Sequence, residues 1–265
     1  MKPGNLAALQ KAFAVQAGAF DSNSYHLSKK EYLDYIIEKT SPKKTDTILE
    51  VAAGTCICGR ALAPYAGHII CLDATAAMLE AGKAECEKAG ISNITLVQGY
   101  AEELPFLANS FDIVISRLAF HHFTEPAAIF GEMIRVLKPG GKLIMIDMVP
   151  ADIALREETD RIETLRDASH IRNLSLREMQ ELYLENGLSL ELQEQTKIPV
   201  SLEAWMDLTN TPEATRQTIR KRMYDNLNGK RVTGFYPYMK DHAVYFDHHW
   251  VFNLGRKGTG KENLL

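Results

Sequence analysis

The chain has 265 residues, of which 46% are hydrophobic, and its formal net charge is −4. This length allows one large α/β domain, or a core with a subdomain, around a substantial buried core. Charges of both signs are interspersed along the chain, so its composition gives no sign of binding to nucleic acid or to an anionic membrane. The exception is a short basic run at 216–222. No apolar run approaches the length of a membrane span, and the N-terminus lacks the features of a signal peptide, so we expect a cytoplasmic protein.

All four cysteines lie in the N-terminal half of the chain, at Cys56, Cys58, Cys71 and Cys86. They have no second cluster of cysteines that would complete a tetrahedral zinc site. We therefore expect four buried thiols and no metal site.

Helical spacing over residues 28–39 places Tyr32, Tyr35 and Ile36 on one side, and the segment SPKKTD then breaks the pattern. The stretch that follows, at 47–59, reads TILEVAAGTCICG and is typical of a buried strand that runs directly into a loop of small residues. Such a loop lets backbone N–H groups approach a ligand at the start of the next helix. Glu50 is a charged residue inside this otherwise apolar strand.

A second apolar strand, at 68–72, places Asp73 at its end. A doubly wound fold puts the carboxylate that binds ribose hydroxyls at about this position. The loop and the acid together indicate an adenosine site. The alternative is that the small residues only relieve close packing of a helix on a strand.

Helices and strands continue to alternate after Asp73. The sequence predicts a helix over 76–89 ended by Gly90, strands at 94–98 and 111–116, a helix over 125–137, a KPGG turn at 138–141 and a strand at 142–148. Parallel neighbours need crossover connections, so this order predicts a parallel sheet with helices on both faces.

The pattern changes from Pro150 onward to longer helices. A helix over 175–185 opens with a Ser-x-x-Glu capping box at Ser175 and Glu178, and strand-like runs follow at 188–195 and 242–254. The segment between these runs contains Trp205, a charged helix through Arg222 and the aromatic residues Phe235, Tyr236 and Tyr238. It could be an insertion that lies over the site, or a surface helical hairpin without a functional role.

Five motifs of the block 47–148 agree in order and spacing with one known family. They are ILEVAAGTCICG, CLDATAAML, QGYAEELPF, NSFDIVISRLAFHHF and RVLKPGGKLIMID. The block, about 100 residues long, resembles class I S-adenosylmethionine-dependent methyltransferases, particularly the branch similar to quinone-biosynthesis C-methyltransferases. The resemblance implies an α/β fold with a Rossmann-like, doubly wound, seven-stranded, mostly parallel sheet and a helical cap.

The resemblance also implies a set of cofactor-binding residues. Glu50 would organise the loop and reach the methionine end of S-adenosylmethionine, Gly54 would give close backbone approach, and Asp73 would bind both ribose hydroxyls. Met78, Ala101 and Glu102 would lie around the adenine. The remaining positions implied at the cofactor are Ala52, Ala53, Ala74, Tyr100, Ser116 and Arg117, of which the last two would lie near the methyl-bearing sulfur.

The sequence departs from the family pattern in two places. Ala52 and Cys56 stand where the family's loop usually carries glycine, which narrows the freedom of the backbone. Tyr100 stands where relatives often place an aspartate that accepts from the adenine amino group, so the adenine could instead stack on the ring or use a backbone acceptor.

Two other functions compete with methyl transfer. A nicotinamide dehydrogenase requires the G-x-G-x-x-G pattern, which fails because Ile57 occupies the third glycine position when the motif starts at Ala52. A regulatory protein that binds S-adenosylmethionine without catalysis would keep the same fold.

Methyl transfer needs mainly alignment of the acceptor with the methyl group, and a base only when the acceptor must lose a proton early. His121 and His122 follow the fourth strand and are candidate bases. The alternative is that one of them hydrogen-bonds the loop while the other is solvated. The pair His248 and His249 in the last strand is expected to face opposite sides of the sheet.

The segment RDASHIR at 166–172 is the second candidate for catalysis, because Asp167, His170 and Arg172 form a polar cluster where the related branch builds part of its substrate pocket. The alternative is structural pairing of Asp167 with His170 or Arg172 at helical spacing.

The sequence thus predicts one methyltransferase domain with three parts. These are an N-terminal helical cap at 1–45, a core at 46–150 that binds S-adenosylmethionine and releases S-adenosylhomocysteine, and a C-terminal part at 151–265 that completes the sheet and carries a helical substrate cap. The expected partner is a small-molecule methyl acceptor, with no nucleic acid and no membrane span, and a homodimer is an open arrangement.

Overall fold

The computed structural model describes residues 5–18, 20–21 and 29–259. In chain order the elements are α1 (Leu6–Gln16), α2 (Lys30–Thr40), β1 (Thr47–Val51), α3 (Ile57–Leu62), β2 (His68–Asp73), α4 (Ala76–Lys88), β3 (Ile94–Gln98), β4 (Phe111–Arg117), the 3₁₀ helix η2 (Phe120–His122), α5 (Pro126–Val136), β5 (Leu137–Val149), the 3₁₀ helix η3 (Ile153–Leu155), α6 (Arg156–Arg166), α7 (Leu176–Glu185), β6 (Leu188–Ser201), α8 (Leu202–Leu208), α9 (Glu213–Leu227), β7 (Tyr238–Lys240) and β8 (Ala243–Lys257). Ser28, where the sequence predicts the start of a helix, lies outside the described residues, and α2 begins at Lys30.

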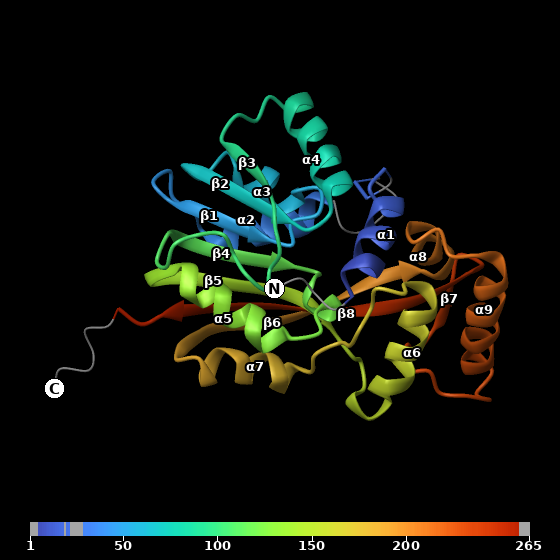
Figure 1. The fold of residues 1–265 in the computed structure, drawn as a ribbon. Helices are drawn as coiled ribbons and strands as arrows, with labels where there is room; N and C mark the ends of the chain where they lie inside the picture. The colour runs from blue at the N-terminus through green and yellow to red at the C-terminus, as the bar shows by residue number, and fades with distance from the viewer. Residues whose placement is uncertain (1–4, 19, 22–28, 260–265) are drawn as a thin grey trace.

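The strands form one sheet in the order β3-β2-β1-β4-β5-β8-β6, and the short β7 pairs with β8 beside this path. Neighbours from β3 to β5 are parallel, whereas β8 runs antiparallel to both β5 and β6. This confirms the Rossmann-like α/β sheet with a last strand pair from the C-terminal segment (Figure 1). The described residues add one short strand, β7, to the seven expected.

Hydrophobic cores lie on both faces of the sheet because alternate side chains of a strand point to opposite faces. Strand β1 sends Leu49 and Val51 into one core, which α5 and α7 cover, and Ile48 into the other, which includes residues of α2, α3 and α4. Figure 1 shows α5 and α7 along the lower side of the sheet and α4 above it. All four cysteines are buried and free, as expected.

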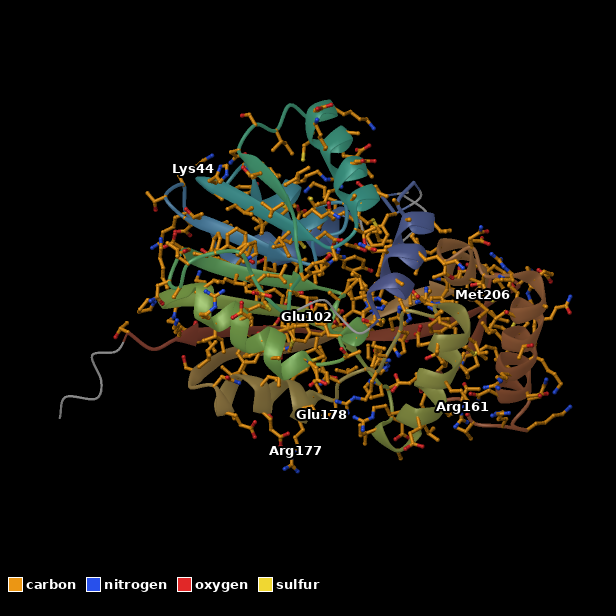
Figure 2. The ribbon with its side chains drawn as sticks, viewed as in Figure 1. Lys44, Glu102, Arg161, Arg177, Glu178 and Met206 are labelled. Atoms are coloured by element: carbon orange, nitrogen blue, oxygen red, sulfur yellow. The ribbon has the colours of Figure 1, made fainter. Side chains whose placement is uncertain are left out.

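A third core belongs to the C-terminal part of the chain. Trp205 of α8 packs against Phe235 and Phe246, together with residues of α6, α9 and the far ends of β6 and β8. Of the predicted aromatic patch, Phe235 is buried here and Tyr236 is half exposed. Figure 2 places Met206 of this part far from Lys44 at the other end of the molecule.

Two local predictions have different outcomes. The capping box forms as expected: the Glu178 N–H donates to Ser175 Oγ and the Ser175 N–H donates to the Glu178 carboxylate. The KPGG segment is not a separate turn, because Leu137 already pairs with Phe111 and the four residues lie inside β5, next to an irregularity in the register.

No helix in the described part of the chain is long and apolar enough to cross a membrane.

Gly255 of β8 allows α7 to pack closely on the sheet. A Cβ atom at this position would lie 2.3 Å from Cδ1 of Tyr183. The Tyr183 ring is fully buried and its hydroxyl donates to Asn253 O at 3.3 Å, so it has little room to move. We expect Gly255→Ala to lower the free energy of unfolding by about 1–3 kcal/mol through overpacking, measured by urea denaturation.

Gly258→Ala is the matched control, because a Cβ atom there meets nothing within 4 Å. Equal stability of the two variants would contradict the close packing of Tyr183 on β8.

Candidate functional site

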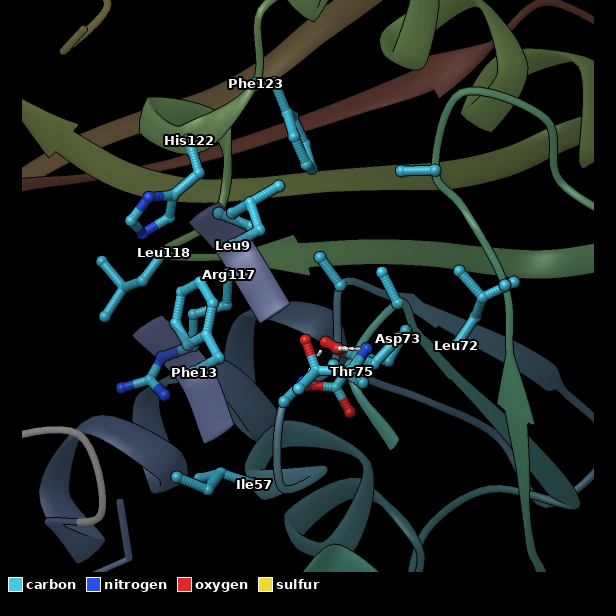
Figure 3. Close-up of a pocket in the computed structure, with 18 of the residues that line it drawn as sticks. Leu9, Phe13, Ile57, Leu72, Asp73, Thr75, Arg117, Leu118, His122 and Phe123 are labelled. Atoms are coloured by element: carbon cyan, nitrogen blue, oxygen red, sulfur yellow. Dashed lines mark hydrogen bonds between the residues drawn. The ribbon is translucent and has the colours of Figure 1, made fainter. Parts of the chain in front are cut away.

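A pocket opens at the carboxyl ends of β1, β2 and β4, the edge at which doubly wound sheets bind ligands. We call it the main pocket. Figure 3 draws its lining, with Asp73 and Thr75 on one side and His122, Leu118 and Phe13 on another. The predicted cofactor residues that line it are Glu50, Ala52, Ala53, Gly54, Asp73, Ala74, Ala101, Glu102 and Arg117.

Asp73 ends β2 and is tied to the loop after β1. Its Oδ2 accepts from the Gly54 N–H at 2.8 Å and its Oδ1 accepts from the Thr75 N–H at 2.8 Å. Burial raises the pKa of the Asp73 carboxyl, and these N–H donors oppose that rise. The carboxylate is therefore held in place by the backbone on both sides.

The loop after β1 adopts the backbone conformation that glycine favours, although two of its positions carry side chains. Ala52, Gly54 and Cys56 have φ of +54°, +55° and +62°. Left-handed backbone costs a residue with a Cβ roughly 1–2 kcal/mol, which explains why glycine is the usual residue at such positions. The structure thus accommodates Ala52 and Cys56, the first predicted departure, in strained backbone.

Glu50 is the buried acid beneath this loop. Its Oε2 accepts from the Gly59 N–H at 2.7 Å and from the Cys71 thiol at 3.4 Å. Burial raises the pKa of Glu50 to about 7, although these donors and two arginines oppose the rise. The side chain holds the first turn of α3 while its charge is poorly compensated.

The raised pKa of Glu50 predicts a slope of stability against pH. Between the ordinary value of 4.5 and about 7, the unfolded chain releases the Glu50 proton while the folded chain keeps it. Stability should therefore fall as pH rises through this window, by up to about 3 kcal/mol, and Glu50→Gln should lack this part of the slope. Urea unfolding at several pH values measures both curves.

Glu80→Gln, which changes an exposed glutamate, should keep the wild-type slope. Identical pH profiles for Glu50→Gln and the wild type would contradict the assignment.

Three predicted cofactor residues do not line the main pocket. Met78 and Ser116 are fully buried, in α4 and at the end of β4. Tyr100 is half buried and its backbone forms a bridge with Glu103. None of the three is among the residues that line the pocket.

Helix α1, which lies in the predicted N-terminal helical cap at 1–45, supplies a wall of the main pocket whose residues were not among the predicted site residues. Leu9 and Phe13 of α1, with Phe20 after it, line the pocket. The helix is held by the Gln10 side chain, which donates to Ala74 O at 3.0 Å, and by Asn5, which donates to a backbone carbonyl at 3.0 Å. No local pattern reveals this wall, because it depends on how α1 docks.

A second, smaller pocket adjoins the main pocket, and we call it the side pocket. It is lined by Phe13, Gln16, Phe20, Leu118, His121, His122, Met148, Arg166, Asp167, Leu208, His248 and Trp250. Phe13, Phe20, Leu118 and His122 line both pockets. A single helix residue of the predicted insertion, Leu208, reaches this lining.

His121 is bound to a buried acid, Asp147 of β5, with 2.6 Å between Nδ1 and Oδ1. Asp147 also accepts from the N–H groups of Ala119 and Phe120, at 3.1 and 2.6 Å, and so shapes the turn after β4. Burial lowers the pKa of His121, but the Asp147 carboxylate together with Glu163 and Asp167 outweighs burial, and the pKa is raised. The pKa of Asp147 is lowered, because the histidine and the N–H donors outweigh burial.

His122 is equally buried and has a different partner, the Ser169 hydroxyl, with 3.1 Å between Nδ1 and Oγ. The Ser169 hydroxyl in turn donates to Asp167 Oδ1 at 2.5 Å. Burial, together with a smaller effect of the neighbouring His121, lowers the pKa of His122 to about 3. The expectation that one of the two histidines is solvated is therefore wrong, since both are buried inside the turn that they help to form.

The pairing expected within 166–172 is also wrong. His170 Nε2 contacts Asp160 at 2.9 Å, and Arg172 donates to Glu178 at 2.6 Å, so neither pairs with Asp167. The physical reason is that α6 ends at Arg166, so the segment is an extended loop without helical spacing. His170 lines neither the main nor the side pocket.

His248 and His249 behave as expected, since His248 is buried on one face of the sheet while His249 is only partly buried on the other. Among the described residues, no group of three His, Cys, Asp or Glu side chains is placed to hold a metal ion.

Comparisons with known proteins agree with this geometry. The family described as "Methyltransferase domain" matches residues 49–145. The Bacillus subtilis protein named "Uncharacterized methyltransferase YcgJ" is 33% identical over 199 residues, which is 75% of this chain and 77% of that protein. Its crystal structure superposes with a TM-score of 0.79 at 28% identity, over 87% of this chain and 99% of that one.

Two further similarities concern proteins with a named activity or ligand. A demethylmenaquinone methyltransferase of Clavibacter sepedonicus is 31% identical over 58% of this chain and 62% of that protein. Haemonchus contortus phosphoethanolamine N-methyltransferase 2, solved in complex with S-adenosyl-L-methionine, shares the fold with a TM-score of 0.65 at 18% identity, over 92% of this chain and 56% of that one.

The extent of the match to the Bacillus subtilis methyltransferase, together with the sheet order and the pocket at the carboxyl ends of its strands, shows the class of this protein. It is an enzyme that belongs to the class I S-adenosylmethionine-dependent methyltransferase family.

Proposed function

We propose that this chain binds S-adenosylmethionine in the main pocket and transfers its methyl group to a small-molecule acceptor in the side pocket. The observation that carries the proposal is the junction of the two pockets, which share Phe13, Phe20, Leu118 and His122. Two adjoining compartments suit a reaction between two bound molecules, because alignment of the reacting atoms supplies much of the rate of a displacement.

The residues of the main pocket fit the nucleoside part of this cofactor. Asp73 carries a carboxylate fixed by two backbone N–H groups, and its free lone pairs suit a pair of ribose hydroxyls. Ala101 and Glu102, in the loop after β3, would flank the adenine. Figure 2 shows Glu102 near the centre of the molecule.

The methionine part of the cofactor would lie at the loop after β1. A Cβ atom on Gly54 would meet only the Phe20 ring, at 3.6 Å, so the loop leaves space beside its backbone. Glu50 is a buried acid whose raised pKa reports poorly compensated charge, and a cationic ligand would supply that compensation. The bound cofactor supplies an activated methyl group on a sulfonium.

The side pocket suits an apolar or aromatic acceptor. Phe13, Phe20, Met148 and Trp250 give it apolar surface, and polar side chains are interspersed among them. A demethylmenaquinone methyltransferase is among the relatives, and a ring-bearing acceptor agrees with these side chains.

His122 is the residue that we place as a base, since it lies at the junction of the two pockets. His121 and Asp147 hold the turn that positions it, and Asp167 contributes through Ser169. His170 is bonded to Asp160 behind the pocket wall, so we leave it out of the machinery.

Calorimetric titration with S-adenosylmethionine, S-adenosylhomocysteine and NAD tests the cofactor. We expect the two sulfur nucleotides to bind and NAD not to bind. Preferential binding of NAD, or no binding of either sulfur nucleotide, would contradict the proposal. A screen of small molecules for release of S-adenosylhomocysteine then finds the acceptor.

A further inference from the structure

We propose that Asp167, Ser169 and His122 form a hydrogen-bond relay that holds the His122 imidazole as its Nδ1–H tautomer. Nε2 is then left as the proton acceptor at the junction of the two pockets, so the acceptor molecule carries an acidic O–H or C–H group. The inference rests on the proposed function, since it names the substrate class of the same site.

The direction of each proton follows from the partners. The Asp167 carboxylate can only accept, and its Oδ1 lies 2.5 Å from Ser169 Oγ. The single proton of the Ser169 hydroxyl therefore points to Asp167. The Ser169 oxygen is left as an acceptor, so the contact of 3.1 Å with His122 Nδ1 requires a proton on that nitrogen.

The relay is rigid because every member is anchored. Ser169 is fully buried, and its own N–H donates to Asp167 Oδ1 at 2.9 Å. Gln16 of α1 donates to the other Asp167 oxygen at 3.4 Å. The Phe13 ring packs edge-on against the His122 ring, with 5.0 Å between centroids. A relay held in this way fixes both the tautomer and the plane of the imidazole.

The surroundings keep the His122 ring neutral at pH 7. Its burial, next to a His121 that is bound to Asp147, lowers the pKa of His122 to about 3. The ring is thus neutral before the reaction but a weak base. The Asp167 carboxylate acts in the opposite direction, because it raises the pKa of His122 and so favours the imidazolium that forms when Nε2 takes a proton.

Proton transfer to Nε2 defines the chemistry of the acceptor. A bond forms between the acceptor atom and the methyl carbon, the carbon–sulfur bond breaks, and its electron pair stays on S-adenosylhomocysteine. The proton of the acceptor's O–H or C–H moves to His122 Nε2 and later to solvent. An amine with a free lone pair needs no such base before it attacks, whereas a phenol or a carbon acid does.

Trp250 carries a further polar group at the side pocket. It lines the side pocket, and its indole Nε1 is buried without a hydrogen-bond partner among the described residues. Buried donors are normally paired, but this nitrogen has almost no accessible surface, so an oxygen on the acceptor would pair with it only after the indole moves.

Nitrogen NMR of protein labelled with ¹⁵N-histidine, recorded at pH 7, measures the tautomer without an acceptor. His122→Gln assigns the signal of His122. We expect the Nδ1–H form in the wild type, and a shift toward the Nε2–H form in Ser169→Ala. His170 is an internal reference with the opposite tautomer, because its Nε2 donates to Asp160. An Nε2–H tautomer of wild-type His122, or an unchanged His122 signal in Ser169→Ala, would overturn the relay.

Kinetics with the acceptor from the screen test the substrate class. We expect a phenol or a carbon acid to be methylated. In Ser169→Ala we expect a kcat at least tenfold lower than that of the wild type and a KM within a few fold of the wild-type value. Methylation confined to amines would overturn the substrate class. Titration of the same samples with S-adenosylhomocysteine separates a failure of the proposed function from a failure of the relay. Absence of binding to the wild type would contradict the proposed function. An Nε2–H tautomer of His122 in the NMR spectrum would contradict the relay alone.

Discussion

Replacing Asp73 with alanine should weaken binding of S-adenosylmethionine about a thousandfold. Hydrogen bonds to a charged group contribute about 1.5–3 kcal/mol each, and two ribose hydroxyls would lose theirs, a loss of about 4 kcal/mol. The Gly54 and Thr75 N–H groups also lose their acceptor, which removes the anchor of the loop after β1. Calorimetry of the purified variant gives the affinity.

Asp73→Asn separates the two contributions, because the amide oxygen can still accept one of the backbone N–H groups while the charge is gone. We expect this variant to bind more tightly than Asp73→Ala and more weakly than the wild type. Thermal unfolding of both variants checks that the loop, and not the whole fold, has changed. An affinity of Asp73→Ala within threefold of the wild type would remove Asp73 from the ribose site.

The central fold could be predicted because its signals are local. Alternation of apolar strands and capped helices gives the parallel sheet, and Ser175 with Glu178 marks the start of α7. The KPGG segment was predicted as a turn because its residues are turn formers, yet it lies inside β5, as an irregularity between Leu137 and Lys142, which both pair with β4. Strand pairing is decided by neighbours that lie far away in the sequence, so local residue preference could not reveal it.

The residues of the candidate site likewise fall into a group that local sequence predicts and a group that only tertiary packing brings together. Glu50, Gly54 and Asp73 lie on one unit formed by β1, α3 and β2, and their places relative to one another follow from its geometry. Phe13 and Ser169 come from segments far from that unit, and only tertiary packing brings them to His122. A single serine in a loop carries no pattern, and therefore sequence reasoning selected its charged neighbours instead.

Replacing His122 with glutamine should lower kcat for the acceptor by about 10²–10⁴-fold, the range typical of the loss of a general base. The affinity for S-adenosylhomocysteine should change by only a few fold, because Asp73 and the loop after β1 are untouched. We expect the loss of kcat because of where His122 lies. Its side chain lines both pockets, and its Nδ1 is bonded to Ser169, so Nε2 is the nitrogen left for the reaction. Steady-state kinetics and calorimetry on the same preparation separate the two effects.

His249→Gln is the matched control, since His249 lies on the other face of β8 and lines neither pocket. A variant at His122 with wild-type kcat would show that alignment alone drives the reaction and that the proton leaves to solvent. A parallel loss of kcat and of cofactor affinity would instead mean that His122 acts through binding of the cofactor. Only a selective loss of kcat agrees with a base, because a proton acceptor acts on the transition state and contributes little to the binding of the nucleotide.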